Sequence, residues 1–145
     1  MISCLVIELR NGYELDDDAG RVDRAAVHRY LSEESYWAAG RPREVMDELI
    51  ATAERVVGLY AADGSQCGFA RVVSDGHTVS YLADVYVLEE HRGNGFGLEL
   101  VRLAVDQKPV ASTKFVLHTR DMHRLYAKLG FAEPDARLME RWPGT

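Results

Sequence analysis

The sequence is poor in cysteine, in positive charge and in long apolar runs, and each shortage excludes a class of protein. Only two cysteines, Cys4 and Cys67, occur in 145 residues, which predicts reduced thiols in a cytoplasmic protein rather than a disulfide framework. Lys and Arg number 17 against 23 Asp and Glu, and they form no basic cluster, so we expect no nucleic-acid partner. The apolar run Cys4–Ile7 is too short for a signal peptide, and no stretch approaches a membrane span, so we expect no membrane partner.

Repeats, low-complexity stretches and long linkers are also missing from the sequence. A chain of 145 residues has the usual length of one domain and can bury a core without disulfides. We therefore predict a single domain over residues 1–145.

The first third of the chain predicts one strand and two helices. Ser3–Glu8 is typical of a strand, and the acidic segment Gly12–Gly20 of a solvated loop. Asp23 suits the N-cap of a first helix, and Pro42 suits the first position of a second helix. The aromatic segment Ser35–Gly40 lies between the two helices.

The middle of the chain predicts a three-stranded antiparallel meander. Arg55–Ala61 and Gln66–Ser74 are rich in β-forming residues, and Asp63-Gly64 between them is a hairpin signal. A second turn at Asp75-Gly76 leads into a long strand, Thr78–Leu88.

The remainder predicts a helix over Gly95–Gln107, a strand over Lys114–His118, a helix capped by Asp121, and a last strand within Arg137–Trp142. The whole is an α/β mixture whose central strands are antiparallel. It is not a doubly wound sheet, in which strands and helices alternate throughout.

The most informative segment is the glycine-rich turn Arg92–Gly97, with the sequence RGNGFG, between the long strand and the next helix. Its glycines allow positive φ and close approach of a ligand, and the start of a helix offers unpaired N–H groups to a phosphate. A dinucleotide fingerprint is excluded because Leu98 stands where its last glycine belongs, and no Gly-Lys-Ser/Thr of a P-loop follows. The alternative is a tight turn without a ligand.

Here the sequence resembles the GNAT superfamily of N-acetyltransferases. The turn matches the family's Arg/Gln-x-x-Gly-x-Gly pattern, and Leu125–Phe131, LYAKLGF, matches its second signature. The resemblance implies a three-layer fold in which a central mixed, mostly antiparallel sheet is flanked by about four helices. It also implies acetyl-CoA as co-substrate and no metal.

The resemblance further implies a set of cofactor-binding residues. In the family the end of the long strand pairs with the pantetheine arm through backbone groups, the glycine turn holds the pyrophosphate, and a tyrosine faces the sulfur as general acid. The matching positions are Val85, Tyr86, Val87, Arg92, Gly93, Asn94, Gly95, Phe96, Gly97 and Tyr126. The N–H of Val87 is the expected donor to the acetyl carbonyl. The alternative for Tyr126 is a core residue, and Thr119 stands where many members have an Asn on the pantetheine.

Other site residues are less specified by the sequence. Asp84 is a candidate catalytic base, as is Glu89, although each is equally well explained as a structural or surface carboxylate. Tyr36 and Trp37 either line the acceptor site or anchor their loop. Asp84 would attract a cationic amine, whereas Arg41, Arg43 and Arg71 would hold a carboxylate, and the sequence does not choose between these. His118, His123 and Cys67 lack the neighbours of a metal or nucleophile site.

The predicted function is transfer of an acetyl group from acetyl-CoA to an amine of a small molecule or peptide, by direct attack in a ternary complex. The alternative is a CoA-binding sensor or regulatory module of the same fold with little turnover. A homodimer is compatible with either.

Overall fold

Six strands form one sheet in the computed structural model, which describes residues 4–144. Each strand pairs with its neighbours in chain order, antiparallel throughout except for β5 and β6, which are parallel. This confirms the predicted mixed, mostly antiparallel sheet. The strands are β1 (Val6–Glu8), β2 (Glu14–Asp16), β3 (Arg55–Tyr60), β4 (Gln66–Ser74), β5 (Val79–Val87) and β6 (Lys114–Val116).

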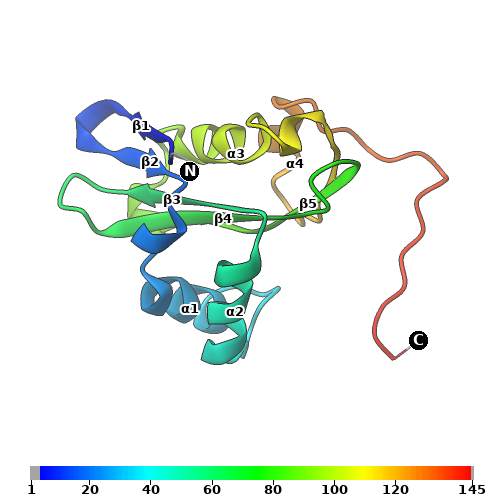
Figure 1. The fold of residues 1–145 in the computed structure, drawn as a ribbon, viewed down its shortest axis with the longest axis horizontal. Coiled ribbons are helices and arrows are strands. Elements are labelled where there is room, and N and C mark those ends of the chain that lie inside the picture. Colours follow the sequence, from blue (N-terminus) through cyan, green and yellow to red (C-terminus); the bar gives the residue numbers. More distant parts are fainter. Residues whose placement is uncertain (1–3, 145) are drawn as a thin grey trace.

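Four α-helices cover the two faces of this sheet (Figure 1). One face carries α1 (Arg24–Glu33) and α2 (Arg43–Thr52), and the other carries α3 (Phe96–Val105) and the short α4 (His123–Ala127). The sheet therefore has a separate hydrophobic core on each side. Because both faces of β3 and β4 are buried, these strands are apolar almost throughout instead of alternating. The predicted three-layer arrangement is confirmed.

Local signals in the sequence place several element ends correctly. The carboxylate of Asp23 accepts a hydrogen bond from the N–H of Ala26 at 3.1 Å, which is the expected helix cap. Gly64 adopts φ +88° in the hairpin between β3 and β4, a conformation that glycine reaches without steric cost. Pro42 directly precedes α2 instead of occupying its first position.

The prediction of a loop over Gly12–Gly20 is wrong in part, because residues 14–16 form β2. Leu15 is fully buried opposite Leu59 of β3, so one apolar side chain is enough to dock this short strand. The neighbouring acidic residues made this strand look like a loop in the sequence. In the fold their charges are paired: Asp16 pairs with Arg21, and Asp17 pairs with Arg55 at 2.7 Å. The first strand begins at Val6, and Ser3 lies outside the described residues.

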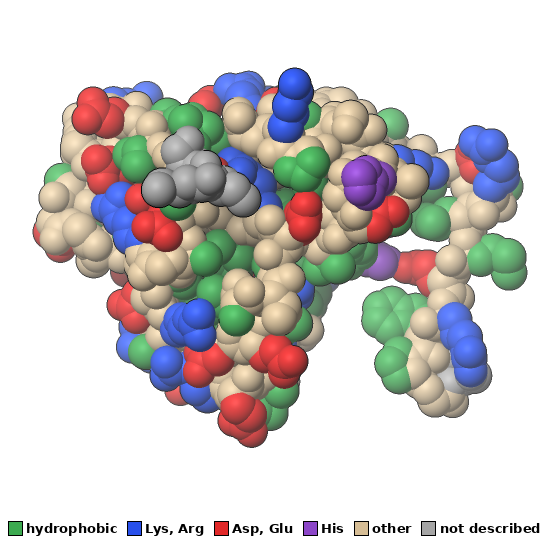
Figure 2. All heavy atoms as spheres, viewed as in Figure 1, with side chains coloured by type: hydrophobic (Ala, Val, Ile, Leu, Met, Phe, Trp, Pro, Cys, Tyr) green, Lys and Arg blue, Asp and Glu red, His purple; other side chains and the backbone are tan. Residues whose placement is uncertain are grey.

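The predicted last strand within Arg137–Trp142 is wrong. Within residues 4–144 the sheet ends at β6, and the segment after Phe131 contains no strand. Figures 1 and 2 show this C-terminal segment extending away from the body of the molecule. Met139 and Trp142 are accordingly 91% and 64% exposed. No sheet edge within the described residues pairs with this segment, so its apolar residues form no strand.

The cap predicted for the last helix is also wrong. The hydroxyl of Thr119, rather than the carboxylate of Asp121, accepts a hydrogen bond from the N–H of Met122 at 3.0 Å, and α4 starts at His123. None of the described helices combines the length and apolar character needed to cross a bilayer.

Candidate functional site

A β-bulge in β5 opens the sheet at its centre. Arg71 of β4 faces Ala83, whereas Phe69 faces Tyr86, so two residues of β5 stand opposite one residue of β4. Asp84, in this bulge, has φ +57°, a left-handed conformation that few residues besides Gly, Asn and Asp adopt. On the other side of β5 the pairing with β6 stops at Tyr81. The backbone from residue 82 to 87 therefore has no described strand beside it on that side.

The glycine turn lies directly after this unpaired edge. Gly93 and Gly95 both have positive φ, and Gly95 is the residue before α3. Among residues 4–144, no protein group accepts a hydrogen bond from the N–H groups of residues 93–98. A Cβ at either glycine would meet no atom within 4 Å, so this side of the turn is open. Such N–H groups, together with the helix dipole, favour an anion.

Two arginines flank the turn, one of which the sequence did not single out. Arg92 donates from Nε to the carbonyl of Val87 at 2.7 Å and so ties the turn to the end of β5. Arg10, from the N-terminal segment, donates to the carbonyl of Asn94 and lies 5.6 Å from the ring centre of Phe96. It is 84 residues from Asn94 in sequence, so only the fold brings this second charge to the turn.

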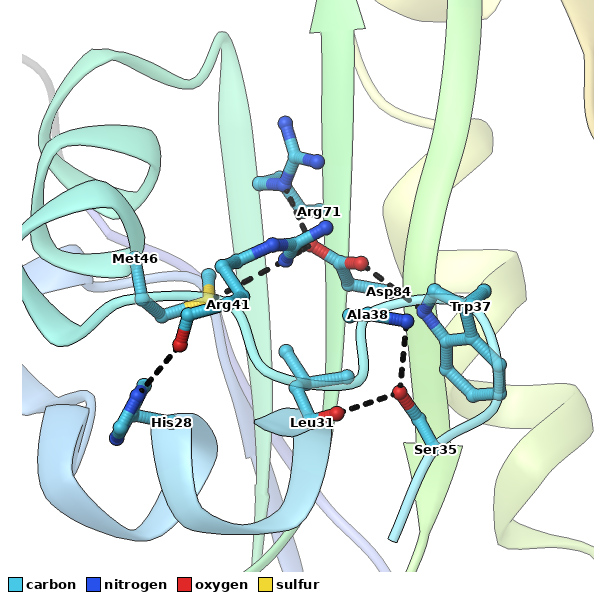
Figure 3. Close-up of polar contacts among 9 residues, drawn as sticks. All are labelled: His28, Leu31, Ser35, Trp37, Ala38, Arg41, Met46, Arg71 and Asp84. Carbon is cyan, nitrogen blue, oxygen red and sulfur yellow. Dashed lines mark hydrogen bonds and ion pairs between the residues drawn. The ribbon is translucent and has the colours of Figure 1, made fainter. Parts of the chain in front are cut away.

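Asp84 is held by three donors, two from the loop between α1 and α2 and one from β4 (Figure 3). Its Oδ2 accepts from Arg41 at 2.8 Å and from Arg71 at 2.9 Å, and its Oδ1 accepts from the indole of Trp37 at 3.0 Å. Its side chain is only 1% exposed. Burial opposes ionisation, but the hydrogen bond from Arg41 and the two guanidinium charges outweigh it and lower the pKa of Asp84. These contacts favour a positioning role for Asp84 over that of a base.

The loop that carries Trp37 is fixed by further hydrogen bonds shown in Figure 3. The hydroxyl of Ser35 donates to the carbonyl of Leu31 at 2.6 Å and accepts from the N–H of Ala38 at 3.1 Å. His28 bonds the carbonyl of Arg41 at 2.8 Å. The loop therefore presents its aromatic side chains in a defined position.

A cavity of about 590 Å³ lies beside the bulge and brings most of the predicted chemistry together. Its walls come from the aromatic loop, β4, β5 and the segment leading into α4. They include Tyr36, Trp37, Arg71, Asp84, Val85 and Tyr126. The predicted acceptor residues and the predicted catalytic residues thus border one space, although their roles stay predictions.

Tyr126 combines the two roles that the sequence left open. Its ring is buried in the core and packs edge-on against Phe131, with the ring centres 5.7 Å apart, yet it also lines the cavity. Burial, with a contribution from Tyr36, raises the pKa of Tyr126 to about 12. The phenol is therefore protonated at neutral pH and available as a proton donor.

Several other candidate site residues lie outside the cavity or already bind another side chain. Arg43 pairs with Asp47 along the exposed side of α2. Glu89 lies in a short 3-10 turn after β5 and does not border the cavity. The ring nitrogens of His118 are taken up by the hydroxyl of Tyr81 and the carboxylate of Glu140.

Cys67 is buried, and this burial raises the pKa of its thiol to about 11. The thiol is therefore neutral at physiological pH, which disfavours a role as nucleophile.

Comparison with known proteins was made against families, curated sequences and solved structures. Residues 24–131 match the acetyltransferase (GNAT) family. A Gibberella zeae protein named as an acetyltransferase is 28% identical, over 86% of this chain and 81% of its own length.

Among solved structures, a GNAT-family protein from Xanthomonas campestris is 36% identical with a TM-score of 0.84, covering 90% of this chain and 92% of that one. An aminoglycoside 6′-N-acetyltransferase from Acinetobacter baumannii shares the fold at 18% identity and a TM-score of 0.61, covering 90% and 98%.

Proposed function

Because the chain belongs to the GNAT family of acetyltransferases, we propose that it transfers an acetyl group from acetyl-CoA to an amine by direct attack in a ternary complex. The main support for the proposal is that two features occur together. One is an open helix start with free N–H donors, and the other is a strand edge with no strand beside it. Within residues 4–144, the backbone N–H groups of residues 93–98 have no protein acceptor, and no strand pairs with β5 beyond Tyr81 on its outer side. The strand edge borders the cavity at Val85 and leads along the chain to the glycine turn.

The residues present fit CoA along this path. The glycine turn would hold the pyrophosphate through its amides, with Arg92 and Arg10 adding positive charge nearby. The free backbone edge of Val85, Tyr86 and Val87 would bind the amide groups of the pantetheine arm as an added strand does. When bound, acetyl-CoA supplies an activated acyl group as a thioester.

The chain's own contribution to the chemistry is orientation and proton supply. Holding both reactants in one cavity replaces an encounter in solution. In this proposal the N–H of Val87 donates to the developing oxyanion, and the Tyr126 hydroxyl protonates the departing sulfur. Because Asp84 is fully engaged by its three donors, we assign it to positioning and expect the amine to lose its proton to water.

We propose nitrogen as the acceptor atom because a neutral amine attacks a thioester directly, without a covalent enzyme intermediate. The fold relative from A. baumannii acts on an amine by its name. Cys67, the buried thiol, is protonated and offers no alternative route.

The test combines binding with turnover. We expect CoA to stabilise the protein in thermal unfolding, by about 2.7 kcal/mol at a hundredfold excess over Kd. We also expect release of free thiol from acetyl-CoA when a panel of amino acids, polyamines, aminoglycosides and peptides is added. CoA binding without any thiol release would favour the sensor module instead, and the absence of binding would reject both functions.

A further inference from the structure

One wall of the cavity beside the β5 bulge is charged. Its net charge is set by three residues, Arg41, Arg71 and Asp84. The Asp84 carboxylate is sealed, at 1% exposure, behind the two guanidinium groups and Trp37. One carboxylate facing two arginines leaves one positive charge uncompensated. A cationic substrate group cannot reach Asp84, because the three donors already occupy the sides from which it would approach.

Arg71, which borders the cavity, has terminal N–H donors that are not bonded to Asp84. Only its Nε is bonded to Asp84, and among residues 4–144 its two terminal nitrogens have no acceptor. These nitrogens are not sealed from solvent, unlike the unpaired Nη2 of Arg55. Arg71 borders the cavity, so these unpaired N–H groups belong to a residue of its lining and are open to a solvent-borne ligand. A guanidinium edge of this kind matches the two oxygens of a carboxylate.

On this basis, and resting on the function proposed above, we propose that the acceptor is an amine that also carries a carboxylate, bound by Arg71 with support from Arg41. A carboxylate, with one negative charge, balances the wall, whereas a phosphate monoester carries about 1.5 to 2 negative charges at pH 7. Tyr36 and Trp37, exposed by 53% and 42%, offer apolar surface for the body of such a molecule.

A different segment of the cavity lining suits the amine end of this acceptor. Asp121, which precedes α4, borders the cavity and is exposed. It lies five residues before Tyr126 in sequence, on the side where the proton is supplied. An amino acid or the end of a short peptide therefore fits with its carboxylate toward β4 and its amine toward α4.

The first experiment needs no variant. Phenylalanine and leucine are compared as acceptors with their uncharged amides, by thiol release from acetyl-CoA. Rates are expressed per concentration of neutral amine, because a carboxylate also raises the pKa of the neighbouring ammonium group. We expect kcat/KM to be at least about tenfold higher for the acids, which corresponds to the strength of a charged hydrogen bond.

The second experiment tests whether Arg71 causes the preference for acids over amides. In Arg71→Gln the ratio of acid to amide should fall toward one, mainly through KM for the acid, while turnover of the amide persists and reports a folded enzyme. Arg43→Gln, a change to an exposed arginine outside the cavity, should leave the ratio unchanged. If Arg71→Gln does not fold, the wild-type comparison decides alone.

The outcomes separate the two proposals. Acetylation of acids and amides at equal rates would overturn the carboxylate proposal and leave the acetyltransferase proposal standing. An unchanged ratio in a folded Arg71→Gln would also overturn it. CoA binding with no acetylation of any amine would overturn both.

Discussion

Trp37 and Asp84 are 47 residues apart in sequence, yet the indole N–H of Trp37 donates to the Asp84 carboxylate at 3.0 Å. This bond joins the loop between α1 and α2 to the bulge of β5. Because Asp84 also binds Arg41 and Arg71, a single buried carboxylate holds the aromatic loop, β4 and β5 in one arrangement. The shape of the candidate site therefore depends on a residue that is itself hidden from solvent.

Replacing this carboxylate should destabilise the protein. Asp84→Asn keeps a side chain that tolerates positive φ but leaves Arg41 and Arg71 without their counter-ion. We expect the free energy of unfolding to fall by about 2 kcal/mol, measured by urea denaturation. The matched control is Asp47→Asn, which removes an exposed pair with Arg43 and should cost less than about 0.5 kcal/mol. Equal losses would mean that the buried cluster contributes no more than a surface pair.

The contribution of Asp84 should also depend on pH in a defined direction. Its pKa is lowered in the folded state, so the folded protein binds this proton less readily than the unfolded chain. The stabilisation is then fully present above the unfolded pKa of about 3.9 and is lost as the pH falls through the lower folded value. We expect the difference in unfolding free energy between wild type and Asp84→Asn to be constant near neutrality and to shrink below about pH 4. A difference that grew on acidification would contradict the assignment.

Removal of the Tyr126 hydroxyl should affect turnover and not cofactor binding. In Tyr126→Phe the ring that packs on Phe131 remains, and only the proton donor is lost. We expect kcat to fall by about a hundredfold or more, with the Kd for CoA nearly unchanged by calorimetry. The control is Tyr60→Phe, since the Tyr60 hydroxyl is buried and has no hydrogen-bond partner among residues 4–144, so its loss should leave turnover intact. Unchanged kcat in Tyr126→Phe would remove this residue from the mechanism.

The glycine turn can be tested with two glycines that share the same backbone strain. Gly95 and Gly64 both have positive φ, and a Cβ at either would meet no protein atom within 4 Å. Alanine at each position should therefore lower the melting temperature to a similar extent, at a cost of about 1 kcal/mol or more. Only Gly95→Ala should weaken CoA binding, by about tenfold or more, because its Cβ enters the space that the ligand approaches. Equal CoA affinity in both variants would contradict a pyrophosphate site at this turn.

The features predicted correctly from sequence are those fixed by residues close together in the chain. The Asp23 cap is three residues from its partner Ala26, and the Asp63-Gly64 turn pairs two adjacent strands. The glycine turn and the neighbouring helix start likewise depend on a few consecutive residues, which is why the acetyltransferase family was recognised from them. The missed strand β2 and the absent strand at residues 137–142 have the opposite origin, because a short strand exists only where a sheet edge receives it.

By itself the sequence determined the order of the main elements, the glycine turn at residues 92–97 before a helix, and the family to which the chain belongs. Only the tertiary structure decided that Asp84 is sealed by Arg41, Arg71 and Trp37, and that Arg10 reaches the glycine turn. It also decided that Arg71 borders the cavity and that its terminal nitrogens have no acceptor among residues 4–144. Local propensities act over a few residues, whereas ion pairing and burial depend on which distant segments meet. Packing therefore decided that the Asp84 carboxylate is already occupied by three donors, which no pattern along the chain records.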